Sequence, residues 1–397
     1  MFNEALLTVG LAGCLMAAQV PAGTKLELRL STKIGSSTSK AGDTFQAVVI
    51  APAVAGDSIV VGTGTKVVGH VKDAKPADSA DQQAVLDLAF DRIEDAKGAA
   101  APISARLAAI DNARETVDKD GRILGIVASK TGSARLDQGI NKVAEKYPGL
   151  AELLGTAKKA IVSETDASIN YAPGVEMTIE LTRSLDWTGQ ATVPDVASIS
   201  PAAELARLAN SEPFQTRAEK PPKPSDITNL MFLGTEDELV RAFEAAGWSP
   251  AKQLSAESKL ETFRAMAEDR GYKEAPVSIL LLDDRPPDLA FEKINNTFAA
   301  RHHLRIWRRP GLFGGQPIWV SSSTHDTGID FSQENRTFIH KIDSYIDRER
   351  AKVVNDLIFT RMVKGLALVD RPAVPAKGYN ATGDQILTDG RMAVVRF

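Results

Sequence analysis

The sequence predicts a multidomain protein: an N-terminal all-β barrel with a helical insertion, followed by a C-terminal α+β domain of the mixed α/β sandwich type. Three patterns predict this. Short alternating segments fill the first half, helical and strand periodicities mix in the second half, and a proline-rich stretch separates them. The 397 residues suffice for two to three domains. We expect an export segment at 1–19, the barrel at 20–190, a linker at 191–225 and the C-terminal domain at 226–397.

Composition narrows the classes of function. The formal net charge is -4 and the sequence pI is about 5.9, so no overall positive field favours nucleic acid, and we expect no nucleic-acid partner. Cys14 is the single cysteine, which excludes an intramolecular disulfide and any cysteine-based zinc site. Any metal must therefore be held by histidine and carboxylate. Beyond the N-terminus no apolar run reaches about 18 residues, so no membrane-spanning helix is expected.

The N-terminal segment Met1–Gln19 predicts export, because its apolar core is too short to span a bilayer. The stretch Leu11-Ala12-Gly13-Cys14 resembles the lipobox of bacterial lipoproteins, in which the cysteine is lipidated. However, Met1–Glu4 carries an acid and no Lys or Arg, so a cleaved soluble signal or a start codon placed too late are alternatives, as is a buried N-terminal strand or helix. We expect an exported protein, either periplasmic or an outer-membrane lipoprotein, that contacts the membrane only through lipid on Cys14.

Strand periodicity continues through the first half of the chain. In Lys25–Leu30, for example, every second residue is leucine, which places the leucines on one face. Gly, Asp and Pro turns separate such segments at about ten-residue spacing, as in all-β barrels and sandwiches. The further strands are expected at Phe45–Ile50, Ile59–Val61, Lys66–Val71, Ala84–Phe90 and Ile103–Ile110.

An internal similarity supports closure of this barrel. Pro21–Leu28 resembles Pro173–Glu180, since each has proline and glycine before an alternating strand, and two such strands could pair and remove an open edge. The pattern resembles the TrbI-like domain of envelope conjugation and secretion machinery. Two amphipathic helices, Leu136–Tyr147 and Leu150–Val162, interrupt the strands. We expect them to cover the barrel mouth as a lid or to pack on the barrel flank.

The second half of the chain alternates helix and strand. Residues 191–225 predict a linker, with a brief helix at Ala202–Ala209 and then an extended chain at Lys220-Pro221-Pro222-Lys223-Pro224. After it, Thr235 and Glu238 form a predicted capping box for a helix ending at Gly247. The remaining expected helices are Ala256–Arg270, Asp288–Ala300 and Arg348–Lys364; the expected strands are Val277–Leu282, Leu304–Arg308, Pro317–Ser322 and a closing hairpin, Ile386–Leu387 with Met392–Phe397, around Asp389-Gly390.

Four sequence blocks between Pro276 and Met362 carry a family resemblance: Asp284–Glu292, Arg301–Trp307, Thr324–Ile329 and His340–Asp343 with the residues up to Leu357. They resemble, in order, the motifs of the LssY C-terminal domain. That domain occurs in bacterial envelope proteins, sometimes attached to membrane phosphatases of the phosphatidic-acid type. The resemblance implies a fold and a compartment rather than a reaction.

The candidate site lies within the same blocks, because four of the five histidines fall between Asp283 and Asp356. Strand alternation places His303 and Arg305 on one face and His302 on the other, so we expect His303 in the site and His302 in a supporting role. The predicted catalytic residues are His303, Arg305, His325, Asp326, His340 and Asp343, with Arg301 and Arg350 as predicted binding residues.

Three interpretations of this cluster remain open. In the first, His303, His325 and His340 bind a divalent metal with Asp326 or Asp343, although no HExxH-type motif is present. In the second, histidine is the base or nucleophile and the arginines hold an anion. In the third, the cluster is a buried polar network without a ligand. The functions that follow are a binding or structural module for an envelope partner or an anionic small molecule, and a phosphoester hydrolase.

Overall fold

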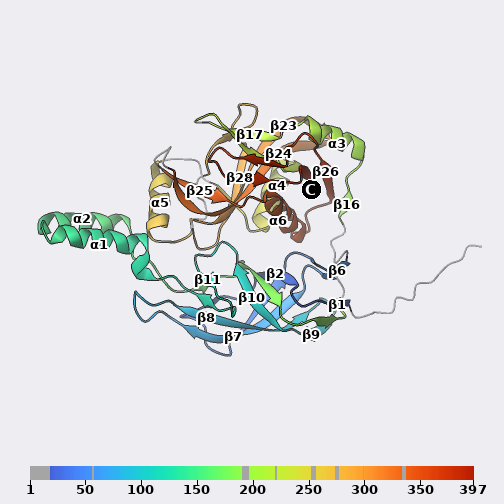
Figure 1. Cartoon of the computed structure of the whole chain (residues 1–397). Coiled ribbons are helices and arrows are strands. Elements are labelled where there is room, and N and C mark those ends of the chain that lie inside the picture. Colours follow the sequence, from blue (N-terminus) through green and yellow to red (C-terminus); the bar gives the residue numbers. More distant parts are fainter. Residues whose placement is uncertain are drawn as a thin grey trace, which may run out of the picture.

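A computed structural model describes residues 18–55, 58–189, 196–219, 221–251, 256–272, 277–297, 299–332 and 337–397. The predicted export segment and Cys14 lie outside these residues, except for Ala18 and Gln19. Two folded halves stack on each other, with the barrel half below the C-terminal half in Figure 1 and helix α6 (Ile346–Phe359) on the side of the C-terminal half that faces the barrel. Among the described residues, no helix is both long and apolar enough to cross a membrane.

The N-terminal half is a nearly closed antiparallel barrel, as predicted. Among the described residues its main path runs through eight strands in the order β10-β14-β2-β4-β7-β8-β12-β11, and β10 lies against β8 and β11, which brings the two ends together. The elements of this half are β1 (Ala18–Val20), β2 (Lys25–Leu30), β3 (Ile34–Gly35), β4 (Thr44–Val49), β5 (Ala53–Ala55), β6 (Ser58–Val61), β7 (Lys66–Lys75), β8 (Val85–Glu94), β9 (Ala100–Pro102), β10 (Ala105–Ile110), β11 (Thr116–Val117), β12 (Ile123–Leu124), the short 3-10 helix η1 (Ala128–Lys130), α1 (Gly132–Ala144), α2 (Pro148–Ile161), β13 (Asn170–Tyr171), β14 (Glu176–Leu181) and β15 (Leu185–Trp187).

The internal similarity marks two neighbouring strands. β2 and β14 pair antiparallel, with Leu26 opposite Ile179 and Leu28 opposite Met177. All four side chains are buried in the barrel core, because alternation turns every second residue of each strand inward. The predicted pairing of the first and last barrel strands is therefore confirmed.

The helical insertion is a hairpin of α1 and α2 that projects sideways from the molecule (Figure 1). Its base is joined by a hydrogen bond of 3.0 Å from the Ser133 hydroxyl to the Ser163 carbonyl. The Ser163 amide donates to Glu268, which directly follows α5 (Ala256–Ala267) of the C-terminal half. The hairpin therefore neither covers the barrel mouth nor lies along the barrel flank, and both predicted placements are wrong. Contacts between α5 and the base of the hairpin hold the hairpin in this orientation.

The C-terminal half is an α+β domain around one mixed sheet in the order β16-β26-β29-β19-β24-β23-β22-β20, with β25 pairing with β24. Its elements are β16 (Ala197–Ser198), α3 (Ala202–Ser211), β17 (Gln215–Ala218), β18 (Pro224–Ile227), β19 (Leu230–Leu233), α4 (Glu236–Ala245), β20 (Ser249–Pro250), α5 (Ala256–Ala267), β21 (Leu280–Leu281), β22 (Leu289–Lys293), β23 (Arg301–Phe313), β24 (Gln316–Ser332), β25 (Thr337–Ile342), α6 (Ile346–Phe359), β26 (Gly365–Asp370), β27 (Lys377–Tyr379), β28 (Gln385–Leu387) and β29 (Arg391–Arg396).

The two faces of this sheet have separate cores. On one face, α4 and α6 pack through Phe243 and Leu357 against side chains such as Leu304. On the other, α3 packs through Leu205 against Trp307 and its neighbours. Leu304 and Trp307 both belong to β23 and differ by an odd number of positions, so they face opposite sides. The same alternation assigns the histidines of this strand to different faces.

Several predicted elements are confirmed. Helix α4 begins with the expected capping box of Thr235 and Glu238, and Gly247 takes the left-handed conformation with φ of 87°. The hairpin between β23 and β24 turns at Gly314 and Gly315, with Phe313 opposite Gln316. Both glycines have positive φ, as a two-residue hairpin turn requires.

Three predictions differ from the structure. The helix expected at Asp288–Ala300 is instead strand β22, paired with β20 and β23. The closing hairpin around Asp389-Gly390 is also wrong: β28 pairs with β27, whereas β29 lies between β19 and β26. Within the expected linker, α3 confirms the brief helix expected at Ala202–Ala209, but this helix and the paired strands β16, β17 and β18 are folded onto the domain. Buried apolar side chains such as Leu205 explain why this segment packs rather than extends.

Candidate functional site

The pairing of β23 with β24 divides the predicted cluster between two faces of the sheet. His302 lies opposite His325, and Arg301 lies opposite Asp326. Since paired residues share a face, His302 and His325 point one way, and Arg301, His303 and Asp326 point the other. The predicted catalytic residues therefore do not form one site.

His303 belongs to a buried polar network centred on Asp326. The Asp326 carboxylate accepts from Arg301 Nε at 3.0 Å, and its oxygens lie 3.3 Å from His303 Nε2 and 3.2 Å from His340 Nδ1. Burial lowers the pKa of His303 well below its usual value, despite the attraction of Asp326. A neutral, enclosed imidazole at this position supports the fold. The expectation that His303 is the site histidine is not supported by this geometry.

The predicted anion-binding arginines are each paired within the protein. Arg305 donates to Asp226 and to the Ser278 carbonyl. Arg350 forms hydrogen bonds of 2.8 Å to both carboxylate oxygens of Asp389. A guanidinium whose donors already meet carboxylates has little capacity left for a ligand anion.

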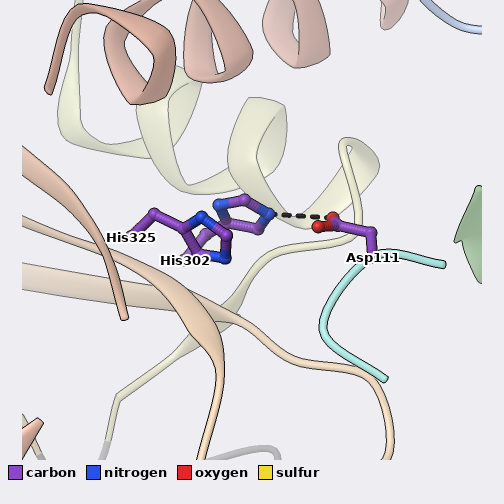
Figure 2. Close-up of side chains that lie close together, drawn as sticks. All are labelled: Asp111, His302 and His325. Carbon is purple, nitrogen blue, oxygen red and sulfur yellow. Dashed lines mark hydrogen bonds and ion pairs between the residues drawn. The ribbon is translucent and has the colours of Figure 1, made fainter. Parts of the chain in front are cut away.

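His302 lies on the other face, between two carboxylates from different halves of the molecule. Its Nε2 is 2.8 Å from Asp111, which directly follows β10 of the barrel, and its Nδ1 is 2.7 Å from Glu349 of α6. Figure 2 shows the contact with Asp111. Burial alone would lower the pKa of His302, but Asp111 and Glu349 raise it to about 10. In this state His302 is an imidazolium that donates a hydrogen bond to each carboxylate.

His325 stacks on His302, with ring centroids 4.2 Å apart and an interplanar angle of 23°. Burial and the neighbouring charge of His302 lower the pKa of His325, so its ring is neutral. His325 Nε2 lies 2.8 Å from Oδ1 of Asn112, whose Nδ2 donates to the Lys293 carbonyl. Asn112 has φ of 48°, a left-handed conformation that asparagine tolerates better than most residues. These contacts fix the loop after β10 against the C-terminal half.

The two histidines line a cavity of about 480 Å³ between the two halves, which we call the interdomain cleft. Asp343, one of the predicted catalytic residues, also lines it, and its backbone amide donates to the His325 carbonyl. The charged lining consists of the carboxylates Glu27, Asp111, Glu176, Asp343 and Glu349 and the cations His302, Arg348 and Lys352. Carboxylates therefore exceed cations in the interdomain cleft.

A buried ion network adjoins the interdomain cleft and contributes Glu176 and Lys352 to its lining. Glu176 of the barrel and Asp356 of α6 both accept from Lys293 and from Lys352, at distances of 2.6 to 2.8 Å. Burial would raise the pKa of Asp356, but Lys293 and Lys352 hold it well below its usual range. Arg29 adds a contact of 2.7 Å to Glu176. The network joins the two halves through charged groups that solvent hardly reaches.

Sequence reasoning missed the barrel side of this site. Asp111 and Asn112 lie about 190 residues before the predicted cluster, and no motif links them to it. The available signal was their position, because Asp111 directly follows the predicted strand Ile103–Ile110. The end of a strand is a common place for functional side chains, but it does not name a partner.

Comparison with known families assigns the C-terminal half. The profile of the family described as LssY C-terminus matches residues 210–392. This part of the chain is an LssY C-terminus domain. The match encloses the four predicted blocks and confirms the resemblance. It includes His302, His325 and Glu349, whereas Asp111 lies outside it, so the interdomain cleft is built by the LssY domain together with the barrel.

Other comparisons add less. No curated protein is matched by this sequence. Among solved structures, the chain is similar to ComB10 of the Com Type IV secretion system of Helicobacter pylori, with 12% identity over 43% of this chain and 90% of that chain. The TM-score is 0.24, too low to assign the barrel or its function.

Proposed function

We propose that this protein is an exported binding protein of the cell envelope whose ligand occupies the interdomain cleft. One observation carries the proposal: the His302 imidazolium is held between Asp111 of the barrel and Glu349 of the LssY domain, at a cavity that both halves line. A ligand in this cleft contacts both halves at once. Binding would then depend on the relative arrangement of the two halves and stabilise it.

The charges of the interdomain cleft favour a ligand with positive charge. Five carboxylates face three cations there, and the arginines expected to hold an anion are paired elsewhere. An anionic small molecule, the ligand suggested by the sequence, would have to contact Arg348 and Lys352 among an excess of carboxylates. Like charges disfavour that arrangement, because their repulsion costs more where water is partly excluded.

The test is binding of two opposite probes, spermidine and inorganic phosphate, to the purified chain by titration calorimetry. We expect spermidine to bind, and the double variant Glu27→Gln/Asp343→Asn to bind it about tenfold more weakly. The matched control, Glu145→Gln/Glu152→Gln, removes two carboxylates from the distant helical hairpin and should leave the affinity unchanged. Binding of phosphate alone, or equal weakening in both variants, would contradict a cation-binding cleft.

A second function, hydrolysis of a phosphoester, is favoured by the two stacked imidazoles and Asp111 at the cavity wall. Such groups can transfer protons to and from a substrate held in the cleft. The purified chain should then hydrolyse bis(p-nitrophenyl) phosphate, and His325→Gln should remove that activity. Hydrolysis that is absent, or that survives in His325→Gln, excludes this function for the cleft.

Export and lipidation are tested separately. We expect the chain in the envelope fraction of a bacterial host and Cys14→Ser in a soluble form, because the substitution removes the residue that would carry the lipid. Mass spectrometry of the N-terminus distinguishes the lipidated from the unmodified chain. Recovery of the wild-type chain in the cytoplasm would contradict export.

A further inference from the structure

We propose that Asp111, His302 and His325 bind one divalent transition-metal ion at the junction of the barrel and the LssY domain. The inference rests on the proposed cation-binding cleft and names the cation. Each residue offers one ligand atom, and these atoms all lie within 4.8 Å of one another, so a single ion can contact all three. Figure 2 shows the three side chains gathered at one point from the two halves.

The surrounding groups orient these ligands as metal sites require. A metal-bound histidine usually gives its second ring nitrogen to a carboxylate or a carbonyl oxygen. Glu349 holds Nδ1 of His302 at 2.7 Å, which leaves Nε2 directed at Asp111. Asn112 Oδ1 lies 2.8 Å from His325 Nε2, so an ion either displaces Asn112 from that nitrogen or binds the ring through Nδ1. His302 therefore has its orienting partner already in place.

The donor set selects the class of metal. Two imidazoles and one carboxylate suit Zn²⁺, Co²⁺ or Ni²⁺, whereas Mg²⁺ and Ca²⁺ prefer oxygen ligands throughout. Three protein ligands beside a cavity of about 480 Å³ leave a coordination position for water or another ligand. This is the arrangement of a reactive or ligand-binding metal site rather than of a closed structural one.

Metal binding displaces a proton from the site. In the metal-free state the proton on His302 Nε2 lies against Asp111. The ion takes the place of that proton, which leaves to solvent, and both the nitrogen lone pair and the carboxylate then bind the ion. Asp111 as a ligand and Glu349 beside His302 together balance the two positive charges of the ion.

The test is calorimetric titration of the chelator-stripped full chain with ZnCl₂, together with metal analysis after desalting. We expect one zinc ion per chain and a higher unfolding temperature with zinc, since the ion joins the two halves. Asp111→Asn and His325→Gln should abolish stoichiometric binding. Glu349→Gln should weaken it about 10- to 100-fold, as loss of an orienting carboxylate does. His70→Gln is the control, because His70 also faces a carboxylate, Asp91, but on the exposed barrel surface.

Each outcome decides the inference. Unchanged stoichiometry in Asp111→Asn and His325→Gln, or loss of binding in His70→Gln, overturns it. If a variant does not fold, Co²⁺ added to the wild-type chain decides: a visible absorption band from nitrogen and oxygen ligands supports the site, and its absence overturns it. If spermidine binds but zinc does not, the metal site is ruled out and the proposed function of the cleft stands. If neither zinc nor spermidine binds, both proposals are ruled out.

Discussion

Gly69 occupies a position in strand β7 where a side chain does not fit. A Cβ there would collide with the Ala89 carbonyl and with the ring of Phe45. That ring packs edge-on against Phe90 at 5.7 Å, so it cannot move without opening the barrel core. The absence of a side chain at Gly69 therefore allows the two aromatic rings to fill the barrel.

We predict that Gly69→Ala destabilises the protein by about 3 kcal/mol, through overpacking of a closed core. Gly139→Ala is the matched comparison: Gly139 lies inside helix α1 with nothing within 4 Å of an added Cβ. There, alanine should stabilise the helix by up to about 1 kcal/mol. Urea unfolding of both variants measures the difference, and equal stabilities would contradict the packing argument.

Asn112 has an unfavourable backbone conformation and makes two hydrogen bonds across the domain junction. We predict that Asn112→Gly loses about 1 to 2 kcal/mol from the contacts to His325 and the Lys293 carbonyl. Asn112→Ala should lose about 1 kcal/mol more, because alanine must also adopt the positive φ. The difference between the two variants in urea unfolding isolates the backbone contribution. Equal losses would mean that the loop changes conformation instead.

Adjacent residues of β23 show what alternation can and cannot predict. Sequence alternation correctly separates His302 from His303. It does not say which face receives partners from elsewhere, so it could not predict that His302, rather than His303, lies at the interdomain cleft. His302 meets Asp111 across 191 positions of sequence, whereas the partners of His303 come from its own sheet. The local sequence pattern determines on which face of the sheet each histidine lies, whereas the contact of His302 with Asp111 depends on the tertiary fold.

At the scale of elements, β22 shows how tertiary pairing overrides propensity. Leu289–Lys293 contains residues that favour helices, and its charges resembled the solvent side of an amphipathic helix. In the structure Glu292 and Lys293 are buried, and each has an ionic partner: Arg301 for Glu292 and Asp356 among those of Lys293. Paired buried charges cannot be distinguished from exposed ones by composition. By contrast, the barrel strands were predictable, because one of their faces is apolar and the other polar.

The helical hairpin buries few of its own side chains. Within its two helices only Ser133 and Ala151 are buried, and its ends meet at the base, where the Thr131 and Thr165 hydroxyls are 3.1 Å apart. A segment with close ends and little buried surface can be removed without pulling the chain apart.

We predict that replacing residues 133–162 with Gly-Ser-Gly leaves the barrel and the LssY domain folded. The unfolding temperature followed by circular dichroism should fall by only a few degrees, after allowance for the lost helical signal. Ser163 and Glu268 are kept, so the contact between the hairpin base and the end of α5 survives. A chain that no longer folds would show that the hairpin is part of the core.

At the scale of the whole molecule, charged groups join the two halves. The lysines Lys293 and Lys352 bridge Glu176 of the barrel to Asp356 of the LssY domain. Asp356 belongs to the last of the four sequence blocks, but neither it nor its partners was assigned to a site, because their spacing carries no pattern. The two halves were predictable separately, whereas the site between them was not: its charges come from β14, β22 and α6.

This junction gives a pH dependence with a definite sign. The pKa of Asp356 is below its usual value in the folded chain, as is that of Glu176. A lowered carboxyl pKa contributes stability that is present above the unfolded pKa of about 4 and is lost as the pH falls through the folded value. We predict that Asp356→Asn loses about 3 kcal/mol at pH 7, because Lys293 and Lys352 lose a buried counter-ion.

The loss should shrink as the pH falls below about 4, since the Asp356 carboxyl then takes up a proton in the unfolded wild-type chain, which reduces the stability that its charge contributes. Urea midpoints of both chains at several pH values between 7 and 3 measure this convergence. Asp120→Asn is the control: Asp120 is exposed, so its curve should run parallel to that of the wild type. A difference in urea midpoint between the wild type and Asp356→Asn that stays constant with pH would mean that the carboxylate acts through its shape rather than its charge. A gap that closes shows that the charge of Asp356 contributes to the acid sensitivity of the junction between the two halves.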